Sequence, residues 1–334
     1  MRVLVAGATG AIGRPLVRAL LGAGREVMGL SRSQAGSHEL TRLGAEPIRA
    51  DAMDRDGLLR AIEGKRADAV IHQATALKNA KLTERRLRND PTTALRIKGT
   101  GNLLAAARLL GARRFLTQSL VLGYGYVDHR ARMLTEEDPF GKSRGSLVDP
   151  VVAGLLSTEE QTLNTDGIDG IALRYGIFYG PGTFSDLFVD LLRKRRLFLP
   201  PGEGGTACWI HVRDAAAATM AALERGRAGQ AYNIVDDEPV TWRSFVTALA
   251  EANGTPRPLT VPGLVIRLVA PYVAALVMDT SMRVSHAKAT RELGWTPTMP
   301  SYRDGIRAAT ADLDSQTPPM QSLAAASESL PPPP

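Results

Sequence analysis

The sequence predicts an α/β fold built around a doubly wound parallel sheet. Short apolar runs rich in β-branched residues alternate with segments whose apolar residues recur at helical spacing. The first run, residues 2–6, stops at a glycine-rich turn, and a helical pattern begins directly after it. The segment 93–110 is a further example, because it places Leu103, Ala107 and Leu110 along one helical stripe. Strands that alternate with helices favour a parallel sheet covered on both faces.

The turn after the first strand is Gly7-Ala8-Thr9-Gly10-Ala11-Ile12-Gly13. Gly7 permits a tight turn, Gly10 lets backbone N–H groups approach a pyrophosphate, and Gly13 lets the helix pack close to the strand. The phosphates would then lie at the positive end of the helix. An ordinary strand-turn-helix with incidental glycines is the alternative. We expect a dinucleotide to contact six residues of this turn: Gly7, Thr9, Gly10, Ala11, Ile12 and Gly13.

Residues after the second and third strands predict which dinucleotide binds. The second strand, 27–30, is followed by Arg32, where an acidic residue would bind the ribose hydroxyls of NAD. An arginine suits the additional 2′-phosphate of NADP, so we expect NADP, with NAD as the alternative. A solvated surface arginine is the competing interpretation. The third strand, 47–51, ends at Asp51, which is expected on the adenine side of the groove, and Ala52 directly after it is expected to contact the cofactor.

Small residues at the carboxyl end of the fourth strand, 68–72, leave room for a cofactor against the backbone. We interpret His72 as a packed strand residue. The sixth strand, 171–176, brings Tyr175 to the same edge of the sheet, and we expect it to contact the cofactor. The cofactor is also expected to contact the three residues that follow the fourth strand: Gln73, Ala74 and Thr75.

The net charge of +7 raises the question of nucleic-acid binding, and the pattern of basic residues argues against it. The arginine clusters lack interleaved aromatic residues and form no recognisable nucleic-acid motif. The largest cluster, 193–196, ends a helical stretch, where cations interact favourably with the helix dipole. A groove for cofactor phosphates would use part of the remaining charge. We expect no metal site.

Several features predict a cytoplasmic protein without a membrane segment. Cys208 is the one cysteine, which excludes an internal disulfide and fits a reducing compartment, and the first apolar run is too short for a signal peptide. The apolar segment 259–278 is interrupted by two prolines and an arginine. We interpret it as a buried or lid-forming helix pair near an apolar substrate rather than a membrane span. Residues 315–334, rich in serine, alanine and proline, are expected to form a disordered tail.

Six motifs occur in an order that resembles the extended short-chain dehydrogenase/reductase family, in its NAD(P)-dependent epimerase/dehydratase branch. They are GATGAIG (7–13), GTGNLL (99–104), RYGIFYGPG (174–182), WIHVRD (209–214), YNI (232–234) and ELGW (292–295). The resemblance implies a Rossmann-type NAD(P)-binding domain, 1–182 plus about 206–235. It also implies a small C-terminal substrate-binding domain, about 183–205 and 236–312. A small-molecule substrate and a homodimer are further implications.

The residues of that family's usual chemistry are missing. The family uses a Tyr-x-x-x-Lys pair, in which the tyrosine moves a proton, and a hydroxyl residue after the fifth strand steadies the substrate oxygen. The resemblance places Val152 at the tyrosine position, Leu156 at the lysine position and Leu120 at the hydroxyl position. No Tyr-x-x-x-Lys occurs anywhere in the chain. A positioned general acid contributes roughly 10²–10⁴-fold to a rate, so the usual mechanism cannot be carried over.

Ser119 and Tyr124 are the polar residues nearest to the missing dyad in the expected fold. We nominate them as substrate-oxygen ligands or proton donors, with packing as the alternative role of Tyr124. Tyr126 and its neighbours are interpreted as a solvated loop. His211 is interpreted as a structural residue that orients the turn before a helix capped by Asp214.

Three functions fit these observations. We favour an NADP-dependent oxidoreductase that acts on a small, fairly apolar carbonyl or hydroxyl compound, because hydride transfer is the simplest explanation of a complete dinucleotide site. A redox-neutral isomerase or cyclase on the same fold is the first alternative. A non-catalytic dinucleotide-sensing protein is the second, because a sensor tolerates apolar residues at the dyad positions.

Overall fold

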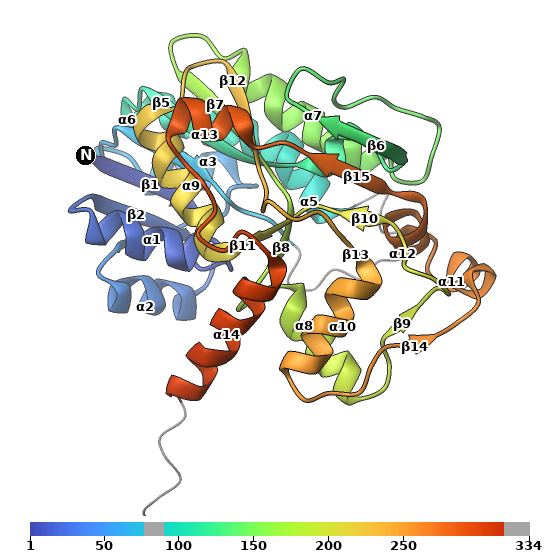
Figure 1. Cartoon of the computed structure of the whole chain (residues 1–334). Helices are drawn as coiled ribbons and strands as arrows, with labels where there is room; N and C mark the ends of the chain where they lie inside the picture. Colours follow the sequence, from blue (N-terminus) through green and yellow to red (C-terminus); the bar gives the residue numbers. More distant parts are fainter. Residues whose placement is uncertain (77–89, 317–334) are drawn as a thin grey trace, which may run out of the picture.

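The central sheet of the protein consists of parallel strands in the order β12-β7-β5-β4-β1-β2-β3 (Figure 1). The computed structural model describes residues 1–76 and 90–316. From one edge of the sheet to the other, the strands are β12 (Gln230–Ile234), β7 (Asp169–Tyr175), β5 (Arg114–Leu120), β4 (Ala69–His72), β1 (Arg2–Ala6), β2 (Glu26–Ser31) and β3 (Glu46–Arg49). The predicted doubly wound parallel sheet is confirmed.

β1 lies in the middle of the sheet because both of its faces are apolar. Val3 and Val5 face one layer of helices, whereas Leu4 and Ala6 face the other, and all four side chains are fully buried. β1 pairs with β2 on one side and with β4 on the other. The strand order therefore reverses between β1 and β4. In such sheets, ligands bind in the crevice outside the carboxyl ends of the strands at this reversal.

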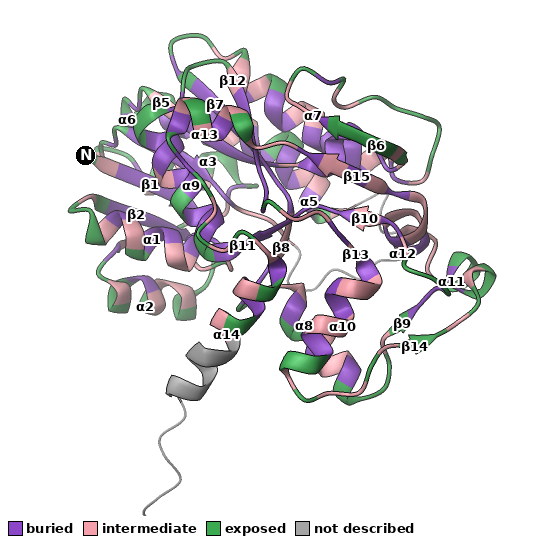
Figure 2. Ribbon diagram, in the orientation of Figure 1, coloured by how far each residue is buried: buried purple, intermediate pink, exposed green. Residues whose placement is uncertain are grey.

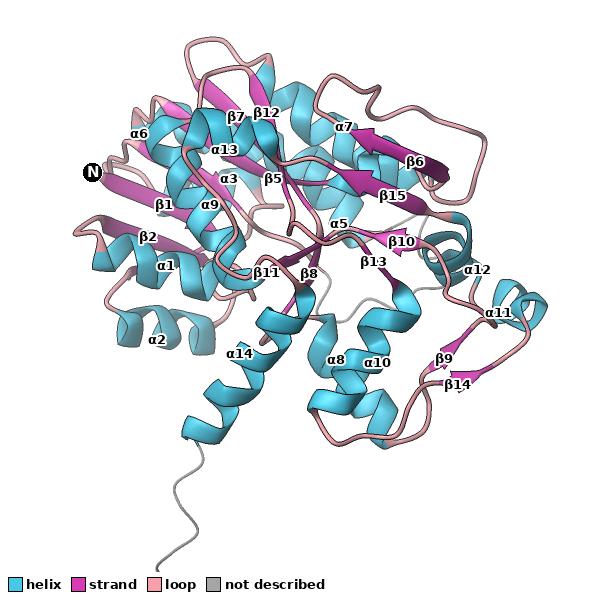
Figure 3. Ribbon diagram, in the orientation of Figure 1, coloured by secondary structure: helices cyan, strands magenta, loops and turns pink. Residues whose placement is uncertain are grey.

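Helices cover both faces of the sheet (Figure 3). The layer on the side of Val3 consists of α1 (Gly13–Gly22), α2 (Gln34–Leu43), α9 (Val212–Arg225) and α13 (Ala287–Leu293). The opposite layer consists of α3 (Arg55–Ala61), α6 (Thr100–Leu110) and α7 (Asp149–Leu163). The buried residues lie along the strands and the inner sides of these helices (Figure 2). The helix expected over 93–110 is interrupted, because the π-helical turn η2 (Leu95–Gly99) joins α5 (Pro91–Ala94) to α6.

A second group of elements lies outside the central sheet. Its short strands pair as β8 (Ile177–Tyr179) with β11 (Trp209–His211), β10 (Thr206–Ala207) with β13 (Val240–Thr241), β9 (Phe198–Leu199) with β14 (Leu259–Thr260), and β6 (Asp128–Leu134) with β15 (Ser281–Val284). Its helices are α8 (Phe184–Arg193), α10 (Trp242–Ala252), α11 (Gly263–Val269), α12 (Pro271–Ala274), the π-helical turn η4 (Ala275–Asp279) and α14 (Tyr302–Gln316). Stacked aromatic rings stabilise this group, and the centroids of Trp209 and Phe245 lie 3.6 Å apart.

The structure assigns different roles to two neighbouring residues at the start of α9. His211 is the N-cap, and its Nδ1 accepts a hydrogen bond of 3.3 Å from the N–H of Arg213. The structural role predicted for His211 is confirmed. The prediction that Asp214 caps the helix is wrong, because its carboxylate instead accepts hydrogen bonds from Thr298 and Met299. Asp214 therefore fastens α9 to the segment before α14.

Two further predictions from the sequence need correction. The segment 259–278 contains the helices α11 and α12, but it is not buried, because α11 exposes 70% of Leu264, 76% of Leu268 and 80% of Val269; the lid-forming alternative stays a prediction. Tyr126 does not lie in a solvated loop: it is buried, and the next residues form β6, which pairs with β15. Of the expected tail, residues 315–316 are helical and 317–334 lie outside the described residues. Over the part of the chain that the structure describes, no helix has the length and apolar character to cross a membrane.

Candidate cofactor and substrate site

The glycine turn has the close backbone contacts that a phosphate-binding turn requires. Gly7 adopts a φ of 86°, and a Cβ atom there would lie 2.6 Å from the carbonyl carbon of Gln73. At Gly13, a Cβ atom would lie 2.0 Å from the carbonyl oxygen of Gly7. At Gly10 the nearest atom would be 3.1 Å away, and Gly10 is exposed. Gly7 and Gly13 are therefore required by the fold, whereas Gly10 is open to a ligand.

The N-terminus of α1 fits an anion. No side chain caps this helix, and no acidic residue lies in its first turn. By contrast, Ser33 caps α2 and Asp54 caps α3. Unsatisfied N–H groups and the helix dipole together favour a phosphate at this position. Thr9 and Ala11 are partly exposed beside the turn, while Ile12 is buried in the core, so Ile12 would contact a ligand through its backbone.

Of the residues predicted on the adenosine side, Arg32 follows β2 as expected, whereas Asp51 lies in the turn after β3 rather than in the strand. Arg32 is exposed directly after β2. Asp51 shapes the turn after β3, because its Oδ1 accepts a hydrogen bond of 2.9 Å from the N–H of Met53. Asn102, for which no role was predicted, donates from its Nδ2 to the carbonyl oxygen of Ala52 at 2.8 Å. The GTGNLL motif thereby fixes the loop that carries Asp51 and Ala52.

Gln73 connects the turn after β4 to the core. Its Nε2 donates to the hydroxyl of Tyr175 at 3.0 Å, and that hydroxyl also bonds Thr219 at 2.7 Å. Tyr175 has no exposed surface, so the prediction that it contacts the cofactor is wrong. Its role is to orient Gln73, whose Oε1 is buried and has no hydrogen-bond partner among the described residues. Ala74 and Thr75 follow Gln73 and are partly exposed.

Tyr124 belongs to a buried polar network rather than to an open cleft. Its hydroxyl donates to Asn233 Oδ1 at 2.8 Å and accepts from Arg174 Nη1 at 3.0 Å. Burial raises the pKa of Tyr124 to about 12. Because the one hydroxyl proton is already donated to Asn233, the structure contradicts the nomination of Tyr124 as a proton donor. Tyr124 instead positions Arg174, which forms an ion pair with Glu159.

Packed apolar side chains occupy the two positions expected for the Tyr-x-x-x-Lys dyad. Val152 is buried in an apolar cluster with Val121 and Leu134. Leu156 packs against Gly141, where a Cβ atom would lie 2.7 Å from the Cβ of Leu156. Ser119 is fully buried, and its Oγ has no hydrogen-bond partner among the described residues.

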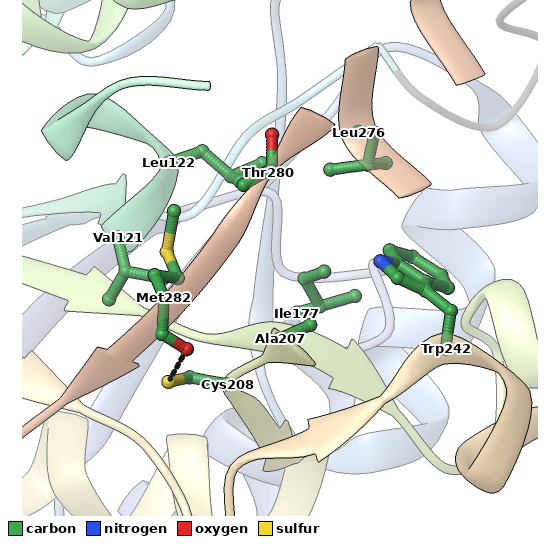
Figure 4. Close-up of a pocket in the computed structure, with 9 residues that line it drawn as sticks. All are labelled: Val121, Leu122, Ile177, Ala207, Cys208, Trp242, Leu276, Thr280 and Met282. Carbon is green, nitrogen blue, oxygen red and sulfur yellow. Dashed lines mark hydrogen bonds between the residues drawn. The ribbon is translucent and has the colours of Figure 1, made fainter. Parts of the chain in front are cut away.

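A small apolar cavity lies where η3 (Val121–Tyr124) meets β8 and other elements of the second group (Figure 4). Its walls are Val121, Leu122, Ile177, Ala207, Cys208, Trp242, Leu276, Thr280 and Met282. The volume is about 10 Å³, which is close to the minimum for one water molecule. Burial raises the pKa of the Cys208 thiol to about 12, so Cys208 contributes an apolar wall rather than a thiolate nucleophile.

A buried cation that was not predicted from the sequence is Arg96, which lies in η2 and is 5% exposed. Its neighbours include Tyr126, Tyr272 and Asp90, and burial lowers its pKa. A signal was present, because Arg96 precedes Leu103 by seven residues and so falls on the apolar stripe of the expected helix. Arginine is almost never fully buried unless it is paired.

His72, at the end of β4, is a packed residue, as predicted. Its Nδ1 accepts a hydrogen bond of 3.3 Å from the N–H of Ala74. Burial, together with the nearby charge of Arg96, lowers the pKa of His72 to about 4. The imidazole is therefore neutral at pH 7 and shapes the turn that carries Ala74.

Comparison with known sequences agrees with this geometry. The model of the NAD dependent epimerase/dehydratase family matches residues 3–235. A 3-diazoavenalumate denitrifying reductase from a Streptomyces species is 35% identical over 315 residues, which cover 92% of this chain and 99% of that protein. A 2-alkyl-3-oxoalkanoate reductase from Stenotrophomonas maltophilia is 30% identical over 271 residues, which cover 77% of this chain and 77% of that protein.

A solved structure shows the same architecture. The UDP-glucose 4-epimerase of Thermus thermophilus, in complex with NAD, is 26% identical, and the superposition gives a TM-score of 0.74. It covers 95% of this chain and 100% of the epimerase. The match spans the phosphate turn, the sheet and the elements that follow. The chain therefore belongs to the NAD-dependent epimerase/dehydratase family and is an oxidoreductase of that family.

Proposed function

We propose that this protein is an NADP(H)-dependent reductase whose substrate accepts a hydride without receiving a proton from a tyrosine. One observation carries the proposal: an open phosphate turn is combined with an apolar α7, in which Val152 and Leu156 are packed. When bound, the nicotinamide supplies the hydride. Arg32, exposed after β2, supports NADP over NAD.

The class of hydride acceptor follows from the missing acid. A carbonyl group that accepts a hydride becomes an alkoxide, which a general acid normally protonates. An aryl diazo group in its diazonium form, which carries a positive charge, has no such need. Its carbon gains the hydride and forms a C–H bond, while the C–N bond breaks and its electron pair leaves with dinitrogen. NADPH is oxidised by two electrons, the diazo carbon is reduced, and this step consumes no proton.

The related Streptomyces enzyme supports this substrate class, because its name describes the denitrifying reduction of a diazo carboxylate. We therefore propose a diazo-substituted, otherwise apolar carboxylate as the substrate. In this mechanism the chain binds the cofactor and the substrate, orients them toward each other and excludes water from them. The turn from Gly7 to Gly13 holds the cofactor phosphates.

The test uses 3-diazo-4-hydroxybenzoate as the probe and NADPH that carries deuterium at C4 of the nicotinamide. We expect NADPH absorbance to fall, dinitrogen to be released, and 4-hydroxybenzoate to carry deuterium at C3. The Gly10→Val variant, which should fold without binding cofactor, is the control. Equal kcat/KM for a 3-oxo acid such as 3-oxohexanoate would contradict the proposal, since that reduction requires an acid. Conversion without NADPH consumption would indicate an isomerase or cyclase, and binding without conversion would indicate a sensor.

A further inference from the structure

Arg96 is as deeply buried as Arg174 but has no comparable partners in the part of the chain that the structure describes. Arg174 is 6% exposed and makes four hydrogen bonds, three of them to Glu159. Arg96 is 5% exposed. Across residues 1–76 and 90–309, no hydrogen bond or ion pair engages its guanidinium. A buried charge is ordinarily paired and hydrogen-bonded, because desolvation strongly penalises an isolated one. Among the described residues, the guanidinium of Arg96 is therefore available to a ligand.

The hydrogen bonds of the side chains that face Arg96 are compatible with a ligand as its partner. The hydroxyls of Tyr126 and Tyr272 are hydrogen-bonded to each other at 3.1 Å, and their ring centroids lie 5.9 Å apart. One hydroxyl proton satisfies that bond, so the other is available to a further acceptor. The carboxylate of Asp90 accepts hydrogen bonds from the N–H and the Oγ1 of Thr93, at 2.9 and 3.1 Å, and so caps α5.

The cluster of Arg96, Tyr126 and Tyr272 lies toward β4 and β5. The charge of Arg96 acts on His72, which ends β4, and Tyr126 lies two residues after η3, which continues β5. The phosphate turn follows β1 instead, on the far side of β4 from β5. The cluster is therefore placed to meet the substrate rather than the cofactor phosphates.

We propose that Arg96, with one hydroxyl of the Tyr126–Tyr272 pair, binds the carboxylate of the substrate. The inference rests on the proposed function, because it assigns a binding site to the carboxylate, which is the part of the proposed substrate that does not react. A guanidinium binds a carboxylate through two parallel N–H···O bonds, and the phenol supplies a third donor. Two tyrosine rings beside the site favour a planar, unsaturated group next to the carboxylate. The two related reductases are named for substrates that are carboxylates.

The experiment measures binding without turnover. The dissociation constants of 4-hydroxycinnamate and its methyl ester are determined by calorimetry with NADP⁺ present. For the parent protein, we expect the acid to bind roughly ten-fold to a hundred-fold more tightly than the ester, since the ester lacks the charge. In Arg96→Met this ratio should fall to near one, while Arg96→Lys should retain part of it. Arg60→Met, at an exposed position of α3, is the matched control.

Two further readouts separate this role from others. A merely structural arginine would lower the melting temperature when replaced, whereas removal of an unpaired buried charge in Arg96→Met should leave it unchanged or raise it. An arginine that binds the other available anion, a cofactor phosphate, would weaken NADP⁺ binding in Arg96→Met and leave the acid-to-ester ratio unchanged. Either result would overturn the proposal.

Equal affinities of the acid and the ester for the parent protein, or no binding of the acid, would also overturn it. These measurements do not depend on hydride transfer. A preference for the acid that requires Arg96, found together with a diazo probe that is not reduced, would therefore reject the proposed reaction and keep the carboxylate site. Reduction of the probe with equal affinity for acid and ester would reject the site and keep the reaction.

Discussion

Arg174 of β7 and Glu159 of α7 form a buried bidentate ion pair. Nη2 lies 2.7 Å from Oε2 and Nε lies 3.0 Å from Oε1, and the two side chains are 8% and 4% exposed. The guanidinium also stacks on Phe140, 3.8 Å from the ring centroid, and donates to Tyr124. This pair fixes the helix that carries Val152 against the sheet.

Removal of Glu159 should destabilise the fold. Glu159→Ala leaves Arg174 buried without its carboxylate, and such losses typically cost about 3–5 kcal/mol. Denaturant unfolding measures the change. The matched control is Asp190→Ala, which breaks the exposed pair of 2.7 Å with Lys194 and should cost no more than about 0.5 kcal/mol. Similar losses in the two variants would contradict the assigned role of the buried pair.

The three glycines of the turn should respond differently to substitution. Gly13→Ala forces a Cβ to within 2.0 Å of the carbonyl oxygen of Gly7, so we expect it to prevent folding. Gly10→Val should fold, because its Cβ meets the nearest atom at 3.1 Å, but should lose cofactor binding. Circular dichroism and NADPH titration distinguish the two effects. A folded Gly10→Val variant with parental affinity would show that the phosphate site is wrongly placed.

Arg32 should determine the cofactor preference. If it contacts the 2′-phosphate, Arg32→Ala should lose about 1.5–3 kcal/mol of NADPH binding, roughly ten-fold to over a hundred-fold, and leave NADH binding nearly unchanged. Calorimetric titration with both cofactors tests this. Arg42→Ala, at an exposed position of α2, should change neither affinity. Equal affinities of the parent protein for NADPH and NADH would reject the assignment.

Tyr124 and Ser119 should affect stability more than chemistry. Tyr124→Phe leaves Arg174 Nη1 and Asn233 Oδ1 without this partner, so we expect a loss of about 1–3 kcal/mol in unfolding free energy. The double variant with Ser119→Ala should reduce 3-diazo-4-hydroxybenzoate at the parental kcat. A folded double variant whose kcat falls by roughly 10²-fold or more would restore these residues as proton donors.

His72 should make stability depend on pH. Its pKa is about 4 in the folded protein against an ordinary value of 6.5, so the unfolded chain binds the proton more tightly. The stabilisation is complete above about pH 6.5 and is lost as the pH falls toward 4, by up to about 3 kcal/mol. His72→Asn, which keeps an acceptor for Ala74, should remove this part of the slope in unfolding experiments. His38→Asn, at an exposed position, should not alter the slope.

The sequence by itself determined the features that depend on neighbouring residues. Apolar periodicity located β1 and α1, and glycine spacing located the turn between them, because strand, helix and turn preferences act over a few residues. The order of the six motifs was sufficient to indicate the family. The apolar residues at Val152 and Leu156 were likewise readable as the loss of the usual dyad.

Only the tertiary structure decided which polar side chains are available. The hydroxyl of Tyr175 bonds Gln73 across 102 positions of the chain, and that of Tyr124 bonds Asn233 across 109, so neither is free for a ligand. Arg96, in contrast, lies within a helical pattern and is buried without a partner among the described residues. Hydrogen-bond satisfaction and burial depend on segments that come into contact only after folding. The local spacing of residues does not show which segments these are.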